Sequence, residues 1–180
     1  MSALKKIKLL VMDVDGTLTD GRIYMGNNGE LFKAFDAKDG CAIHDMLPRV
    51  EVDWREYNRT NDKESVLGIV PCIITGRKSE IVSQRCKELG INNIYQGYKD
   101  KVEALNLLAE KFYIEQNEEG VYEEIAYIGD DIIDIPAMKK CGMVAAPADA
   151  VKEVQILADF VSGKRGGEGA VREFIERRLI

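Results

Sequence analysis

Short apolar runs alternate with amphipathic stretches along most of the chain. Runs rich in branched residues predict buried strands, and apolar residues at helical spacing predict helices. The predicted strands are 7–12, 69–74, 93–95, 124–128, 143–145 and 160–162. The predicted helices are 38–47, 79–89, 102–112, 132–140 and 151–157, with a final helix from about residue 170. This alternation indicates an α/β fold, a doubly wound, Rossmann-like parallel sheet covered on both faces.

Three segments depart from this rhythm. Segments 22–25 and 30–35 flank two glycines and two asparagines, which predicts a β-hairpin at 22–35 in place of a cap domain. Residues 51–65 are charged and without a clear period, so we expect a surface insertion there. Residues 163–180 begin with a glycine-rich stretch and form a predicted C-terminal tail. A length of 180 residues suits a single domain, 1–180, with one well-buried core.

Composition and charge argue against several classes of protein. Lys and Arg number 25 against 31 Asp and Glu, a net charge of −6 that argues against a nucleic-acid or anionic-membrane binder. No apolar run approaches the roughly 20 residues that cross a bilayer. The four cysteines include no C-x-x-C pair and are expected to be reduced thiols of a cytoplasmic protein.

Polar side chains follow four of the predicted strands. They are Asp13, Asp15, Gly16 and Thr17 after the first strand, Thr75, Gly76 and Arg77 after the second, Lys101 after the third, and Asp130, Asp131 and Asp134 after the fourth. Each alone has an ordinary interpretation, such as a turn residue, a helix cap or a solvated charge. Because ligands of open α/β sheets bind beyond the carboxyl ends of the strands, the convergence predicts one site.

The residue types in this set suit phosphoryl transfer. Asp13, Asp15 and Asp130 offer the oxygen ligands that Mg²⁺ prefers. A carboxylate beside Mg²⁺ and Lys101 can attack phosphorus and form an aspartyl phosphate, while Thr75 donates a hydrogen bond to a phosphoryl oxygen. A receiver-type signalling domain uses a similar set of residues. In such a domain the phosphoaspartate is itself the signal. Asp15 lies two residues after the candidate nucleophile and favours an enzyme that hydrolyses its phosphoaspartate in each turnover.

The sequence resembles the haloacid dehalogenase superfamily of phosphatases. The resemblance lies in DVDGT at 13–17, Thr75, Lys101 and GDDIID at 129–134. More specifically, DVDGTLTDG at 13–21, FDAKDG at 35–40, IITGR at 73–77, QGYKDK at 96–101 and GGEGAVRE at 166–173 are similar to the 3-deoxy-D-manno-octulosonate (KDO) 8-phosphate phosphatase family. Related phosphatases of nonulosonate (sialic acid or KDN) 9-phosphates, and a non-catalytic partner of a sugar-nucleotide synthetase, remain alternatives.

The resemblance implies a role for each site residue. Asp13 would be the nucleophile and a metal ligand, and Asp15 would act as acid and base while its backbone carbonyl binds Mg²⁺. Thr75 and Lys101 would hold the phosphoryl group, and Asp130 would complete the metal site. Asp131 or Asp134 would support the metal ligands, and the implied substrate-binding residues are Gly16, Thr17, Gly76, Arg77 and Arg165.

The resemblance also implies partners. The substrate would be a small sugar phosphate, and the chain would form a homotetramer through the hairpin at 22–35. The glycine-rich tail, from residue 166 to 173, would reach toward the site of a neighbouring subunit.

Overall fold

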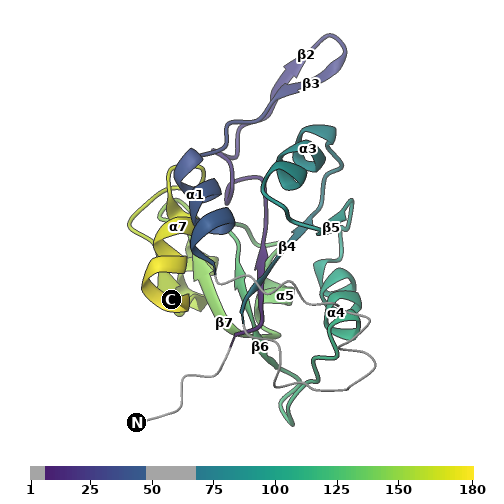
Figure 1. Ribbon diagram of the computed structural model, residues 1–180, viewed down its shortest axis with the longest axis vertical. Coiled ribbons are helices and arrows are strands. Elements are labelled where there is room, and N and C mark those ends of the chain that lie inside the picture. Colours follow the sequence, from purple (N-terminus) through teal and green to yellow (C-terminus); the bar gives the residue numbers. More distant parts are fainter. Residues whose placement is uncertain (1–6, 48–67) are drawn as a thin grey trace.

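The computed structural model describes residues 7–47 and 68–180. Within them a six-stranded parallel sheet has the strand order β5-β4-β1-β6-β7-β8 (Figure 1). The strands are β1 (Leu9–Met12), β4 (Val70–Thr75), β5 (Asn93–Gln96), β6 (Tyr122–Ile128), β7 (Cys141–Ala146) and β8 (Phe160–Val161). The predicted doubly wound sheet is confirmed. The insertion predicted at 51–65 lies outside the described residues.

Helices cover both faces of the sheet, so β1 is buried on two sides. Leu9 and Val11 point into one apolar core, and Leu10 and Met12 into the other. The first core is shared with α4 (Lys101–Lys111), α5 (Ile135–Met138) and α6 (Lys152–Leu157). The second is shared with the π-helical turn η1 (Ala42–Met46), which continues α1 (Ala37–Cys41), and with α3 (Glu80–Glu88) and α7 (Ala170–Phe174). Burial on both faces explains why the strand is a continuous apolar run.

The strand order reverses beside β1. The chain runs from β1 to β4 and β5 on one side, and then returns to add β6 on the other side. Parallel pairing joins β1 to both β4 and β6. The crevice beyond the carboxyl ends of β1 and β6 is therefore the switch point at which ligands of such sheets bind.

The predicted helix at 132–140 is much shorter in the structure, where α5 spans only Ile135–Met138. The residues before it form a loop whose backbone donates to the side chain of Asp134, and Pro136 follows at the start of the helix. Strand β7 begins at Cys141, two residues earlier than expected. Among the described residues, no helix has the length and apolar character required to cross a bilayer.

The hairpin projects away from the sheet as a separate two-stranded unit (Figure 1). It comprises β2 (Tyr24–Gly26) and β3 (Gly29–Phe32), shorter than the predicted strands, and a single bridge between Thr19 and Phe35 closes its base. Its apolar side chains are largely exposed to solvent. They are Ile23, Met25, Leu31 and Phe32.

The C-terminal segment packs into the core, and its helix begins at Ala170, as the sequence predicts. Helix α7 and the following π-helical turn η2 (Ile175–Leu179) contribute fully buried side chains to the core. These are Ala170, Val171, Phe174 and Ile175. The glycine-rich stretch before α7 packs on the chain's own loop, where Gly167 donates its backbone N–H to the carbonyl of Thr17 at 3.1 Å. Residues 166–175 are thus part of the sheet's own covering layer.

Asp39 anchors α7. Its buried carboxylate accepts backbone N–H bonds from Gly169 at 3.3 Å and from Arg172 at 2.8 Å. Burial raises the pKa of Asp39 from 3.8 to about 6, although these backbone bonds lower it in part. A carboxyl from α1 thereby satisfies N–H groups that the start of α7 leaves unpaired.

Replacing Asp39 with Asn should change how stability depends on pH. Because the folded state raises this pKa, Asp39 contributes stability that is fully present below pH 4 and is lost as pH rises through about 6. The free energy of unfolding of the natural chain, minus that of Asp39→Asn, should fall by up to about 3 kcal/mol between pH 4 and 7. Urea titrations of both chains in EDTA, repeated across this pH range, measure the difference in the free energy of unfolding.

Candidate active site

The nucleophile candidate follows the central strand directly. Asp13 continues the ladder after β1 by donating its backbone N–H to the carbonyl of Ile128 at 3.1 Å, and it is almost fully buried. The Nζ atom of Lys101 lies 2.7 Å from its Oδ1 atom. Lys101 is the first residue of α4 and is also buried. A strand end and a helix start therefore place a buried ammonium against a buried carboxylate.

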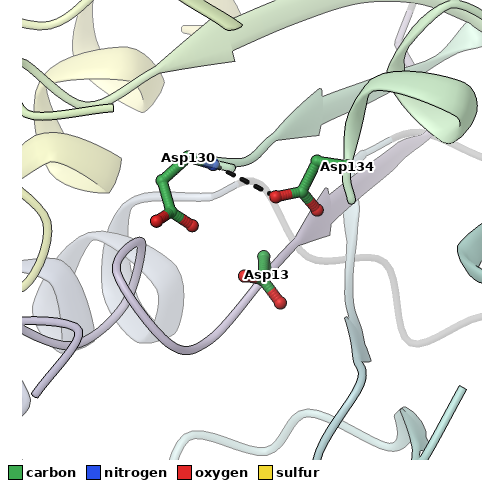
Figure 2. A group of neighbouring side chains, drawn as sticks. All are labelled: Asp13, Asp130 and Asp134. Carbon is green, nitrogen blue, oxygen red and sulfur yellow. Dashed lines mark hydrogen bonds between the residues drawn. The ribbon is translucent and has the colours of Figure 1, made fainter. Parts of the chain in front are cut away.

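Asp134 ties this pair to the neighbouring loop. Its Oδ1 atom accepts from Lys101 at 2.7 Å and from the Tyr127 hydroxyl at 2.8 Å. Its Oδ2 atom accepts the backbone N–H groups of Asp130 and Asp131, both at 3.2 Å, and Figure 2 shows the first of these bonds. Both oxygens of Asp134 are engaged by donors from its own chain. The side chain therefore fixes the loop that carries Asp130.

Asp130 faces Asp13 across the switch point (Figure 2). Asp13, Asp130 and Asp134 each offer a carboxylate oxygen, and these three atoms lie within 4.8 Å of one another. The Thr17 hydroxyl donates to Asp130 Oδ1 at 3.2 Å. A Cβ atom on Gly16 would lie 2.1 Å from Asp130 Oδ2, so the close approach of this loop requires glycine.

The electrostatics of this cluster favour a divalent cation. When all three carboxylates are ionised, the cluster carries two negative charges in excess of the Lys101 ammonium. Burial, reinforced by the charge of Asp13, raises the pKa of Asp130 to about 8. Burial also raises the pKa of Asp13 to about 6, although Lys101 opposes the shift. Burial alone would lower the pKa of Lys101, but the carboxylates of Asp13 and Asp134 raise it. Oxygen donors with this surplus charge fit Mg²⁺.

Thr75, Gly76 and Arg77 lie beside these groups, because β4 is the neighbour of β1 and ends at Thr75. Thr75 is buried, while Arg77 is half-exposed. The Asp15 side chain points to a different set of partners, outside the three carboxylates. Its Oδ1 atom pairs with the ammonium of Lys33, and its Oδ2 atom lies 3.8 Å from Arg77 Nε.

Three further predicted residues have partners within the chain itself. The Thr17 hydroxyl binds Asp130, so in this structure it orients a carboxylate. Asp131 is exposed and accepts the N–H of its neighbour Ile132, whereas Asp134 occupies the centre of the network. The exposed Arg165 pairs with Asp149 at 3.3 Å, on its own chain.

Sequence reasoning missed Tyr127, Lys33 and Glu30. Tyr127 lies within an apolar strand and carries no pattern that separates it from core residues. Lys33 follows the hairpin strand β3, and its ammonium pairs with Glu30 of that strand and with Asp15, which comes from a separate segment of the chain. No local sequence signal reports the contact with Asp15.

Comparison with protein families identifies the superfamily. Residues 77–175 match the model of haloacid dehalogenase-like hydrolases. Over 180 residues the chain is 43% identical to the KDO 8-phosphate phosphatase KdsC of Escherichia coli, covering all of this chain and 83% of that protein. The chain belongs to this family of haloacid dehalogenase-like hydrolases. The predicted superfamily and phosphatase class are confirmed.

Solved structures of this family share the fold over nearly the whole chain. The KDO 8-phosphate phosphatase of Moraxella catarrhalis, in complex with magnesium ion, phosphate ion and KDO, has a TM-score of 0.78 and 37% identity. That match covers 98% of this chain and 87% of the other. The cobalt-bound enzyme of Haemophilus influenzae has a TM-score of 0.77 and 32% identity, with 98% and 89% coverage.

Mg²⁺ should stabilise the fold through Asp130. Saturating Mg²⁺ should raise the melting temperature by about 5–10 °C, because binding to the folded state alone adds a few kcal/mol. Asp130→Asn should abolish most of this shift. In EDTA the same variant should melt no lower than the natural chain, since a neutral amide replaces a carboxyl whose charged form burial and Asp13 disfavour. Differential scanning calorimetry measures both, with Asp131→Asn as the matched control that keeps the Mg²⁺ shift.

Proposed function

We propose that this chain is a Mg²⁺-dependent phosphatase that hydrolyses KDO 8-phosphate through an aspartyl phosphate on Asp13. The observation that carries the proposal is the buried Asp13 at the switch point, 2.7 Å from Lys101 and facing Asp130. Relatives that are 38–43% identical over almost the whole chain are KDO 8-phosphate phosphatases. The relative from Moraxella catarrhalis binds magnesium ion, phosphate and KDO together.

The chemistry follows from the positions of the side chains. A carboxylate oxygen of Asp13 attacks phosphorus, and the bond from phosphorus to the sugar oxygen breaks as Asp15 gives that oxygen a proton. Water then attacks the aspartyl phosphate, Asp15 takes the proton back, and phosphate leaves with Asp13 restored. When held by Asp13 and Asp130, Mg²⁺ supplies positive charge to the phosphoryl oxygens. Lys101 adds a second fixed positive charge beside Asp13.

Asp13→Asn should abolish release of phosphate from KDO 8-phosphate, with a loss of at least about 1,000-fold in kcat, because an amide is not a nucleophile. Asp15→Asn should lose about 100-fold or more on KDO 8-phosphate, but it should still transfer the phosphoryl group of 4-nitrophenyl phosphate to Asp13 in a first-turnover burst, because that leaving group needs no proton. Phosphate release with Mg²⁺ measures turnover, and nitrophenolate absorbance measures the burst. Near-natural turnover by Asp13→Asn would contradict the proposal, and faster turnover of a nonulosonate 9-phosphate would reassign the substrate.

We also propose that the chain forms a homotetramer through its hairpin and acts in the cytoplasm. Two strands alone are marginally stable in water, and this hairpin exposes a set of apolar side chains. The rings of Tyr24 and Phe32 stack at 4.2 Å across it, which gives the exposed face a fixed shape. Self-association would bury that face. The four cysteines are free thiols, which suits a reducing compartment.

Charges on the hairpin should dissociate the assembly. Met25→Glu combined with Phe32→Glu places carboxylates on the apolar face, so light scattering should report the mass of a monomer or dimer in place of a tetramer. Leu107→Glu changes another exposed apolar residue, on α4 and outside the hairpin, and as the control it should leave the mass unchanged. A natural chain that is monomeric at micromolar concentration would contradict the tetramer.

A further inference from the structure

A buried lysine stands at the base of the hairpin. Lys33 directly follows β3, and its side chain is only 1% exposed. Its ammonium pairs with Oδ1 of Asp15 and, at 2.9 Å, with Oε1 of Glu30. A buried ammonium is costly unless it is paired. This lysine is held by two carboxylates, one of which belongs to the proposed catalytic machinery.

The same cluster joins the hairpin to the end of β4. Glu30 accepts a hydrogen bond from the hydroxyl of Ser79, the residue that precedes α3. Arg77 lies 3.8 Å from Glu30 as well as from Asp15. The two cations and two anions balance in charge. The cluster therefore fixes the hairpin base, the start of α3 and the Asp15 side chain with respect to one another.

The two oxygens of Asp15 have different surroundings. Lys33 occupies Oδ1 directly. Among the described residues, Oδ2 has the more distant guanidinium of Arg77 as its ion-pair partner. A carboxyl group pinned at one oxygen presents the other in a fixed direction, and proton transfer depends on such placement of the acid.

We propose that Lys33 is a positioning residue for Asp15, holding Oδ1 so that Oδ2 exchanges a proton with the leaving-group oxygen and then with water. This inference rests on the proposed function. In the first step the proton moves from Asp15 to the sugar oxygen as its bond to phosphorus breaks, and in the second it returns from the attacking water. Lys33 keeps its own protons throughout and acts on the substrate only through Asp15.

The test compares two leaving groups in the Mg²⁺-loaded full chain. Lys33→Met should lower kcat on KDO 8-phosphate by about 10- to 100-fold, a part of what general acid–base catalysis contributes. In the first turnover its rate of 4-nitrophenolate release from 4-nitrophenyl phosphate should stay within about threefold, because nitrophenolate leaves without a proton. Lys33→Arg, which keeps a cationic donor, should recover part of the loss. Lys38→Met removes an exposed lysine five residues further on and should change neither substrate.

The outcomes separate the two proposals. If the natural chain releases no phosphate from KDO 8-phosphate, the proposed function fails before any variant is considered. If it does, an equal loss on both substrates, or no loss on KDO 8-phosphate, overturns the role of Lys33. Glu30→Gln tests whether the effect of Lys33 comes only from docking of the hairpin. Docking predicts that this variant also loses activity on KDO 8-phosphate and spares 4-nitrophenyl phosphate, whereas direct positioning of Asp15 by Lys33 predicts no such pattern. The thermal unfolding of each variant is measured alongside its activity. If Lys33→Met does not fold, Lys33→Gln takes its place in the same comparison.

Discussion

The ion pair between Lys101 and two buried aspartates is the constraint on which the rest of this structure depends. The Lys101 ammonium lies 2.7 Å from both Asp13 and Asp134, and all three side chains are buried. A cation at the first residue of a helix opposes the helix dipole, so the position of Lys101 is explained by its partners, with Asp100 capping the helix through Val102 N–H. Removing either carboxylate leaves an ammonium buried with one partner fewer.

Close packing around this ion pair accounts for the glycines nearby. A Cβ atom on Gly129 would come within 2.5 Å of the Asp134 carboxyl carbon, and one on Gly166 would lie 1.8 Å from the carbonyl oxygen of Gly16. Neither position therefore has room for the Cβ atom of another residue. The loop after β6 thus lies against Asp134, and the stretch before α7 packs on the loop after β1 that carries Gly16. The glycine-rich segment that resembles the family pattern therefore contacts the chain's own loop in this structure.

The sequence predicts the sheet well because burial on both faces of the central strands makes each a continuous apolar run, and polar residues mark where the runs end. The neighbourhood of Asp13, Lys101 and Asp130 follows from that pattern alone. The pattern does not distinguish Asp131 from Asp134, since the difference lies in which side chain turns inward to meet Tyr127 and Lys101. Asp39 and Lys33 were missed for the same reason. Their roles arise from contacts between segments far apart in the chain, which periodicity does not encode.

The hairpin would link the proposed assembly to the proposed chemistry, because it lacks a core of its own. Its tip exposes apolar residues, while its base is fixed by the paired charges of Lys33 and Glu30 and by the Ser79 hydroxyl. A displacement of the two strands would move Lys33, and with it the Asp15 side chain that it binds. An interface that stabilises the hairpin would therefore also stabilise the orientation of Asp15. A small projecting element can in this way replace part of what a cap domain provides, by fixing an acid rather than by covering the site.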